Sequence, residues 1–315
     1  MKSAEPASTS QTVSVIVATR SRPGLMRAAV RSILAQDYPG AIEVVVVFDQ
    51  TPVDVQVPEE FTGAGEAGPR RVVIRANDRS PGLAGARNCG ALASTGAMLA
   101  FCDDDDAWTT PKLRKQVSAM AAERAGLSVS GIEITMGDRT HVRIPSPADL
   151  TVEELARRRV MEAHPSTVVV TRAAFDRIGL VDELIPGSYA EDYDWMLRAV
   201  ADQRVAVVSE PLVHVLWHPG SFFSTQWETI IEALDYCVAK HESIRRSPQG
   251  MARIYGQKAF AFAALGKRVE ARHWAWRSLR LSPKERRSYL ALATSLRLVS
   301  ASRVVALANS RGKNI

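Results

Sequence analysis

The fold of this chain is decided by one stretch, Met98-Leu99-Ala100-Phe101-Cys102-Asp103-Asp104-Asp105-Asp106. Its apolar half predicts a buried strand, and that strand runs directly into four carboxylates. Adjacent carboxylates repel one another, so four of them at a strand end require a cation nearby. An Asp-x-Asp pair there suits Mg²⁺ or Mn²⁺ bound together with substrate phosphates. The alternative is an acidic loop or helix N-terminus, where aspartate serves only as a cap.

Strand and helix patterns alternate on both sides of this stretch. Short apolar runs predict further strands, at 13–17, 43–48, 72–74, 128–134, 167–171 and 205–208. Helical patterns predict helices between them, with Pro23 in the first turn of one that reaches Leu34, at 112–125, after residue 171 as far as Ile178, and at 193–201. Residues 82–93 are typical of a small-residue loop and helix. The four valines before Phe48 are typical of a strand buried on both faces of a parallel sheet. The chain is therefore expected to be an α/β protein, Rossmann-like, with a mostly parallel sheet flanked by helices.

The character of the chain changes near residue 224. Residues 225–315 show only helical patterns and hold 17 Lys/Arg against 6 Asp/Glu, whereas residues 1–224 hold 23 against 28. The net charge of +6 thus divides into an acidic body and a basic, all-helical extension. We expect a flexible start at 1–12, a catalytic or binding domain at 13–224 and the extension at 225–315.

Composition excludes several classes of protein. With 46% hydrophobic and 23% charged residues, the 315-residue chain is typical of a globular protein. Its three cysteines form no CxxC pair, which excludes a disulfide scaffold and a zinc finger and favours a reducing compartment. No apolar run reaches 18 residues, and the first twelve residues lack the apolar core of a signal peptide. We therefore expect a cytoplasmic protein.

Seven stretches, in order, resemble the family 2 inverting glycosyltransferases with the GT-A fold. They are residues 15–23, 31–36, 43–49, 82–90, 101–106, 189–194 and 213–221. The resemblance covers residues 13–224. It implies transfer of a sugar from a nucleotide-sugar donor, UDP-linked or dTDP-linked, to an acceptor hydroxyl. The acceptor would be a saccharide or a lipid-linked molecule, in the synthesis of cell-surface polysaccharide or glycolipid.

The resemblance also implies which residues bind the donor. Asp105, assisted by Asp103, would hold the divalent cation, and His218 is a candidate for a further metal or phosphate contact. A hydrogen-bonded loop histidine is the alternative for His218. The nucleotide-binding candidates share a place at strand ends or in the matching motifs: Ala18, Thr19, Arg20, Asp49, Arg87 and Asp104. The alternative for Thr19 and Asp49 is that each only caps a helix or a turn. The alternative for Arg87 is a solvated arginine at the start of a helix.

The acidic motif at 189–194 implies the catalytic base. Asp192 matches the family's base, which would take the proton from the attacking hydroxyl. Glu191 and Asp194 are the alternative carboxylates, and acidic residues at a helix N-terminus are the structural alternative. One displacement assisted by one base would invert the anomeric configuration.

Two departures and two rival functions bear on this assignment. Phe48 stands where the family usually has an acidic residue, and one extra residue precedes Pro111. A catalytically inactive nucleotide-sugar-binding protein is disfavoured because Asp103, Asp105 and Asp192 are all present. A sugar-phosphate nucleotidyltransferase would need a Gly-rich, basic loop after the first strand, which Ser21-Arg22-Pro23-Gly24 does not supply.

The basic extension suggests a further partner. Residues 267–315 carry twelve Lys/Arg and two acids, and they contain no recognised nucleic-acid-binding motif. Such a surface would attract anionic headgroups. We expect peripheral contact with the inner face of a membrane through 267–315, with a solvated helical bundle or a homodimer contact as the alternatives.

Overall fold

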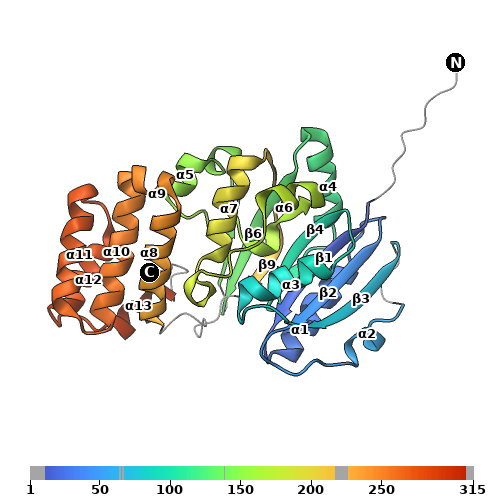
Figure 1. Ribbon diagram of the computed structural model, residues 1–315, viewed down its shortest axis with the longest axis horizontal. Coiled ribbons are helices and arrows are strands. Elements are labelled where there is room, and N and C mark those ends of the chain that lie inside the picture. Colours follow the sequence, from blue (N-terminus) through green and yellow to red (C-terminus); the bar gives the residue numbers. More distant parts are fainter. Residues whose placement is uncertain (1–10, 64, 66, 138, 217–225, 310–315) are drawn as a thin grey trace, which may run out of the picture. The chain divides into compact units, whose positions relative to one another are not determined.

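The structure, a computed structural model, describes residues 11–63, 65, 67–137, 139–216 and 226–309. The chain divides into two compact units (Figure 1). The first unit comprises Met1–Ile132, Ala163–Leu180 and Asp202–His214, and the second comprises Glu133–Glu162, Val181–Ala201 and Val215–Ile315.

The domain limits expected from sequence, 1–12, 13–224 and 225–315, stay predictions. Residue 224 and residues 1–10 lie outside the described residues. Gln11 and Thr12, the last two residues of the expected flexible start, are hydrogen-bonded to other residues of the first unit. The carbonyl of Gln11 accepts from the Tyr38 hydroxyl at 2.5 Å, and that of Thr12 accepts from the Met98 N–H at 3.2 Å.

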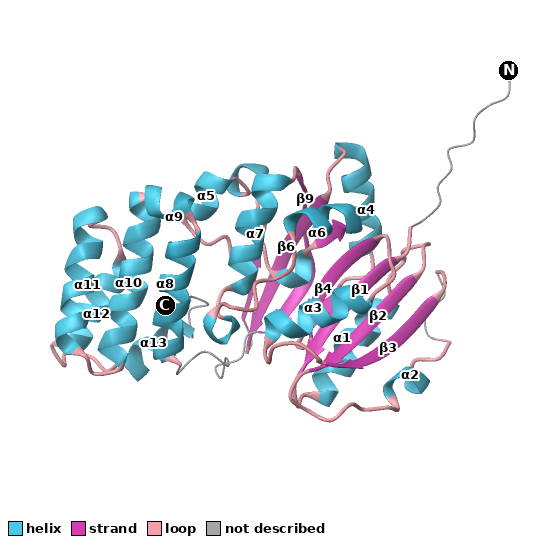
Figure 2. Ribbon diagram, in the orientation of Figure 1, coloured by secondary structure: helices cyan, strands magenta, loops and turns pink. Residues whose placement is uncertain are grey.

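The first unit contains most of a nine-stranded sheet (Figure 2). Its strands run in the order β3-β2-β1-β4-β8-β6-β9-β5, with β7, which belongs to the second unit, paired to β6 off this path. The strands are β1 Val13–Thr19, β2 Ile42–Phe48, β3 Arg70–Ala76, β4 Met98–Asp103, β5 Asp106–Trp108, β6 Leu127–Met136, β7 Arg139–Arg143, β8 Val169–Thr171 and β9 Val205–Leu216. The pairs β3–β2, β2–β1 and β1–β4 are parallel, whereas β8 is antiparallel to both β4 and β6.

Burial explains why the central strands read as continuous apolar runs. Every residue of β1 and of β2 is buried, as expected for parallel strands covered on both faces. In contrast, β9 continues to Leu216, beyond the end predicted at 208, because Ser209 and Glu210 are exposed and interrupt the apolar run without ending the strand. A prediction that ends a strand at its last consecutive apolar residue therefore cuts short a strand with one face exposed to water.

The register brings three strand ends to one edge of the sheet. Val17 pairs with Val46 on one side and with Cys102 on the other, so that Thr19 lies opposite Phe48 and Ala18 lies opposite Asp103. Ligands of open α/β sheets bind at the carboxyl ends of such strands. We therefore expect a ligand-binding site at the edge formed by the carboxyl ends of β1, β2 and β4.

Helices follow these strands and cover the sheet. They are α1 Pro23–Leu34, α2 Val57–Glu60, α3 Leu83–Ala93, α4 Lys112–Glu123 and α6 Arg172–Ile178, with the 3₁₀ turn η2 at Pro165–Thr167. Helix α3 packs on β1 and β2 through small residues. A Cβ on Gly90 would lie 2.5 Å from Cγ2 of Ile16, and one on Gly85 would lie 1.9 Å from the carbonyl oxygen of Ser80. Only glycine allows these approaches.

The second unit is mainly helical. Its helices are α5 Val152–Arg157, α7 Glu191–Asp202, α8 Trp227–Lys240, α9 Glu242–Arg246, α10 Pro248–Ala264, α11 Arg268–Leu281, α12 Arg286–Ser295 and α13 Ala301–Asn309, with 3₁₀ turns η1 Pro147–Asp149 and η3 Pro186–Ser188. A core of mostly alanine, around Phe260, joins α10, α11, α12 and α13. The described residues after 226 contain no strand, so the predicted all-helical extension is confirmed. None of the described helices combines the length and the apolar character needed to span a membrane.

The close approach at Gly85 is a test of this packing. We expect Gly85→Ala to lower the free energy of unfolding by about 1–3 kcal/mol, because a methyl group there must displace the backbone at Ser80. Gly24→Ala in α1 is the matched control: its Cβ would meet nothing within 4 Å, so we expect about 0.5–1 kcal/mol of stabilisation. Urea unfolding followed by circular dichroism measures both. Equal effects of the two substitutions would contradict the packing described for α3.

Candidate functional site

Four carboxylates meet at the strand edge of the first unit, and their sets of partners differ. Asp103 ends β4, Asp104 and Asp105 form the turn, and Asp106 begins β5. The short strand β5 makes the acidic stretch a tight β-turn-β, which points successive side chains in different directions. Their environments therefore differ although the residues are adjacent.

Asp104 is held by the segment that follows β1. Its carboxylate accepts from Oγ1 of Thr19 at 2.7 Å and pairs with Arg22 at 2.5 Å. Burial raises the pKa of Asp104 to about 6, opposed by Thr19 and Arg22. Arg22 also pairs with Asp105 at 2.6 Å. Arg22 was not predicted from the sequence as a site residue. Its position between the end of β1 and the start of α1 at Pro23 was the feature that could have indicated it.

The remaining nucleotide-binding candidates lie along the same edge. Ala18 is buried at the end of β1, and Arg20 is exposed just beyond it. Asp49 follows β2, is 6% exposed, and accepts from the Gly82 N–H at 3.1 Å and from the Asn77 amide at 2.8 Å. Asp49 thus ties the loop before α3 to the end of β2. Contact of any of these residues with a nucleotide stays a prediction.

Arg87 lies in α3 beside the metal-binding candidate Asp103. It is 4% exposed, and its Nη2 donates to Oδ1 of Asp103 at 2.7 Å. The backbone N–H of Asp103 in turn donates to Oγ of Ser166 at 3.0 Å. A buried guanidinium at this position can offset negative charge either on Asp103 or on a phosphate bound nearby.

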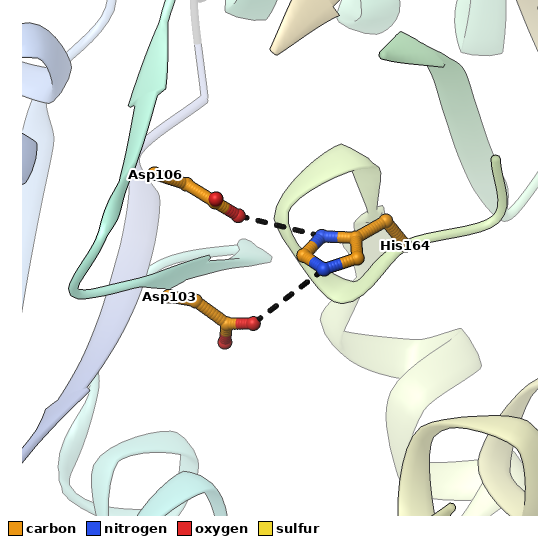
Figure 3. A group of neighbouring side chains, drawn as sticks. All are labelled: Asp103, Asp106 and His164. Atoms are coloured by element: carbon orange, nitrogen blue, oxygen red, sulfur yellow. Dashed lines mark ion pairs between the residues drawn. The ribbon is translucent and has the colours of Figure 1, made fainter. Parts of the chain in front are cut away.

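The structure also groups Asp103 with two residues that the sequence did not predict as metal ligands. One oxygen each of Asp103 and Asp106 and a ring nitrogen of His164 all lie within 4.8 Å of one another (Figure 3). His164 Nε2 is 3.8 Å from Asp103, and Nδ1 is 3.4 Å from Asp106. Two carboxylates and an imidazole are a donor set that can hold a divalent metal ion.

The loop that carries His164 is fixed by η2. Ser166 donates from Oγ to Asp106 at 2.5 Å, so the turn and β5 are bonded directly. Burial raises the pKa of Asp106 to about 7, the charge of His164 lowers it, and that of Asp103 raises it. Nothing in the local sequence connects His164 to residues some sixty positions earlier, which is why only the folded chain brings them together.

The acidic motif of the second unit begins helix α7. Asp192 is bound by Arg159, whose Nη2 donates to both carboxylate oxygens at 2.9 and 2.6 Å. The side chain of Asp192 is 17% exposed, whereas Glu191 is 3% exposed. The acids at the start of α7 are also favoured by the helix dipole. Arg159 was not predicted, although it belongs to the run Arg157-Arg158-Arg159.

Asp194, two residues later, is in a different environment. It is fully buried and contacts three cationic or ionisable groups, Lys240 at 2.8 Å, His241 at 2.7 Å and Arg198 at 3.0 Å. Burial raises its pKa, but the hydrogen bonds from His241 and Lys240 outweigh burial, and the pKa falls to about 2. Such a carboxylate is a structural anchor and a poor proton acceptor.

His218 lies outside the described residues, so the structure neither places it near the strand edge nor away from it. Asp105 contacts Arg22 and, among the described residues, is not part of the group formed by Asp103, Asp106 and His164. Asp103 is therefore the residue shared by the metal set predicted from sequence and the group found in space.

The two metal sets make different predictions for cation binding. Asp106 must be ionised to bind a cation, so with a pKa of about 7 its proton competes as the pH falls. We expect Mn²⁺ affinity to drop by up to about tenfold per pH unit below about pH 7, and less steeply in Asp106→Asn.

Calorimetric titration with Mn²⁺ at about pH 6 and about pH 8 measures this dependence. Asp105→Asn is the matched control, since it removes a neighbouring carboxylate that pairs with Arg22. Loss of Mn²⁺ binding in Asp105→Asn, with unchanged binding in Asp106→Asn, would assign the cation to the Asp103–Asp105 pair instead.

Comparison with known proteins identifies the family. A relative in Escherichia coli, the UDP-Glc:alpha-D-GlcNAc-diphosphoundecaprenol beta-1,3-glucosyltransferase WfaP, is 26% identical over 221 residues, which cover 70% of this chain and 82% of that protein. The solved structure of S. aureus TarS 1-349 in complex with UDP-GlcNAc is similar with a TM-score of 0.59 and 17% identity, covering 96% of this chain and 92% of that chain. A mannosyltransferase, PcManGT from Pyrobaculum calidifontis in complex with GDP-Man and Mn2+, has a TM-score of 0.53 and 16% identity, covering 98% and 89%.

These similarities confirm the predicted GT-A type of fold. The pattern of Glycosyl transferase family 2 matches residues 14–179, from the first strand of the sheet to the end of α6. That match spans more than half of the chain and includes the acidic strand end and the loop of His164. The predicted family is thereby confirmed: the chain belongs to glycosyl transferase family 2, and it is a glycosyltransferase.

Proposed function

We propose that this glycosyltransferase is metal-dependent and inverting, and that it moves a sugar from a UDP-linked or dTDP-linked donor to an acceptor hydroxyl. The observation that carries the proposal is the set of differently bound carboxylates where β4 ends, at the strand edge where α/β sheets bind ligands. The relative WfaP is named for a UDP-Glc donor, and TarS was solved with UDP-GlcNAc.

The donor side uses the first unit. Thr19, Asp49 and Asp104, with Ala18 and Arg20 beside them, would contact the nucleotide. A Mg²⁺ or Mn²⁺ ion at Asp103 would offset the negative charge that develops on the diphosphate as it leaves. PcManGT, which shares the fold, was solved with Mn2+. Asp105 and His218 remain the other metal candidates from sequence, and Asp106 and His164 are those from the spatial group.

Arg87 would serve the same leaving group from α3. Its guanidinium is nearly buried and already faces a carboxylate of the candidate metal site. A fixed, poorly solvated cation stabilises developing negative charge more strongly than a mobile surface arginine does. Asp103, the ion-pair partner of Arg87, would then be shared between Arg87 and the cation.

The base is Asp192 of the second unit. Its carboxylate would accept the proton of the acceptor hydroxyl as that oxygen forms its bond to the anomeric carbon and the nucleoside diphosphate leaves. Arg159 donates to both carboxylate oxygens and thereby fixes the orientation of the carboxylate. Glu191 stays the alternative, whereas the three basic side chains that contact Asp194, those of Arg198, Lys240 and His241, make it the weaker candidate.

The setting we propose is the assembly of a cell-surface polysaccharide or glycolipid at the inner face of a membrane. WfaP is named for an acceptor in which a sugar is joined through a diphosphate to undecaprenol. A saccharide on such a carrier is the acceptor class that we propose for this chain. A saccharide without a lipid is the alternative acceptor.

The assignment of the base gives a direct test. Asp192→Asn keeps the shape of the side chain but removes its basicity, so we expect transfer to fall by about 10²–10⁴-fold with UDP affinity unchanged. Glu191→Gln is the matched control and should retain most activity. A panel of UDP-linked and dTDP-linked sugars, followed by release of nucleoside diphosphate and by NMR of the product anomer, measures both.

The outcomes separate the rival functions. Transfer at the wild-type rate in Asp192→Asn, with loss in Glu191→Gln, would move the base to Glu191. Binding of nucleotide sugars without turnover of any donor would favour the inactive binding protein. Release of diphosphate from a nucleoside triphosphate and a sugar phosphate would favour the nucleotidyltransferase.

We also propose that the region 267–315 contacts an anionic membrane surface. Helix α11 exposes one face on which Trp276 is 60% exposed and lies one turn from the exposed residues Arg272 and Arg280. An exposed tryptophan among arginines is typical of a helix that rests at a membrane interface. Beyond α11, Leu298 is 77% exposed.

Vesicle co-sedimentation tests the membrane contact. We expect binding to phosphatidylglycerol-rich vesicles but not to phosphatidylcholine alone, weakened by salt and by about 1 kcal/mol for each of Arg272→Gln and Arg280→Gln. Arg246→Gln, at a 78% exposed arginine of α9, is the matched control. Absent or salt-insensitive binding would leave the extension as a packing element or a homodimer contact, which analytical ultracentrifugation distinguishes.

A further inference from the structure

A cluster of arginines surrounds the start of helix α7 in the second unit. Arg159 binds Asp192, Arg253 of α10 donates to the hydroxyl of Tyr193 at 3.0 Å, and Arg287 of α12 pairs with Glu285 at 3.1 Å. The charges of all three arginines lower the pKa of Tyr189, against burial, which raises it. The three guanidiniums therefore share one neighbourhood around Tyr189, three residues before the proposed base Asp192.

Arg253 differs from the other two in having no acidic partner. Arg159 faces Asp192 and Arg287 faces Glu285, but none of the described residues offers Arg253 a carboxylate within ion-pair distance. Its contacts are the Tyr193 hydroxyl, the Tyr193 ring at 5.2 Å and Gln257 at 3.4 Å. All of these contacts are to neutral groups.

This isolation is costly because Arg253 is buried. The side chain is 9% exposed, and its Nε has no hydrogen-bond partner among the described residues. Nε of Arg287 is likewise buried and unbonded. Burial lowers the pKa of Arg253, and the nearby charges of Arg287 and Arg159 lower it further. Buried cations in proteins are normally paired, so two unbonded guanidinium N–H groups in one cluster indicate a missing anion.

We propose that Arg253, with Arg287 and Arg159, binds a phosphate group of the acceptor, the diphosphate that joins the acceptor sugar to its carrier. This inference rests on the proposed function, because it assigns the acceptor class of the same enzyme. The planar guanidinium fork matches phosphate oxygens, and several arginines together suit a doubly charged group. Arg159 and Arg287 are 30% and 27% exposed, which leaves the cluster open to a ligand.

The chemistry of such an acceptor explains why the cluster lies beside the base. When a sugar is joined directly to a diphosphate, its attacking hydroxyl and the first phosphate are separated by one sugar ring. A base for that hydroxyl and a cation site for that phosphate must then be neighbours. Asp192 and Tyr193 are consecutive residues, and they contact Arg159 and Arg253 respectively.

Calorimetry with inorganic pyrophosphate tests the site without the acceptor. The titration is done with EDTA and saturating UDP, so that the first unit's nucleotide and metal positions do not contribute. We expect the wild-type protein to bind pyrophosphate and Arg253→Gln to bind it about tenfold or more weakly, with Arg253→Lys in between. Arg246→Gln removes an exposed arginine of the same unit and should bind as wild type does.

The same variants separate the source of the phosphate. Farnesyl diphosphate that binds more tightly than pyrophosphate would identify a lipid-linked acceptor, whereas equal affinities would identify a soluble phosphorylated saccharide. In a transfer assay, Arg253→Gln should raise KM for the acceptor about tenfold or more and leave KM for the donor unchanged. A purely structural arginine would change neither constant selectively.

Two results would overturn the inference. One is wild-type protein that binds no pyrophosphate, and the other is folded Arg253→Gln that binds it as tightly as wild type does. Arg287→Gln, at a more exposed side chain, gives the same test if Arg253→Gln does not fold. Pyrophosphate binding that depends on Arg253 in a protein without transferase activity would contradict the proposed function and leave the anion site standing.

Discussion

Repulsion among four consecutive carboxylates is the constraint around which the first unit is organised. The strand β4 delivers Asp103 to Asp106 into a largely buried turn, where unpaired negative charges would be unstable. The four carboxylates are therefore met by three other segments of the chain: the end of β1 with the loop after it, helix α3, and the turn η2 with its preceding residue His164. The pairs are Asp103 with Arg87, Asp104 with Thr19 and Arg22, Asp105 with Arg22, and Asp106 with Ser166 and His164.

The same principle separates two aspartates of the second unit. Asp194 is fully buried among three cationic or ionisable side chains and has a pKa of about 2, whereas Asp192 is bound by Arg159 and remains partly exposed. Two carboxylates of one helical turn are thus suited to different tasks, one to anchoring α7 and the other to proton transfer. Arg253 is the complementary case, a buried cation for which the described chain provides no anion.

Much of the candidate site could be predicted because it lies at strand ends. The apolar runs fixed where β1, β2 and β4 end, and parallel pairing then brought Thr19, Asp49 and Asp103 to one edge. The order of the seven motifs predicted the family, and the match of the family pattern over residues 14–179 confirmed it. The role of each residue toward donor or cation remains a prediction, and His218 lies outside the described residues.

By itself, the sequence determined the α/β sheet, the helical extension, the family and the acidic strand end, because each is written in local periodicity or in contiguous motifs. Only the tertiary structure decided which basic side chain lies against which carboxylate. Arg22, Arg159 and His164 meet their carboxylates across 33 to 83 positions of sequence, and such contacts depend on strand order and on loop paths rather than on spacing. The isolation of Arg253 is of the same kind, since a missing partner becomes visible only when every neighbour is in place.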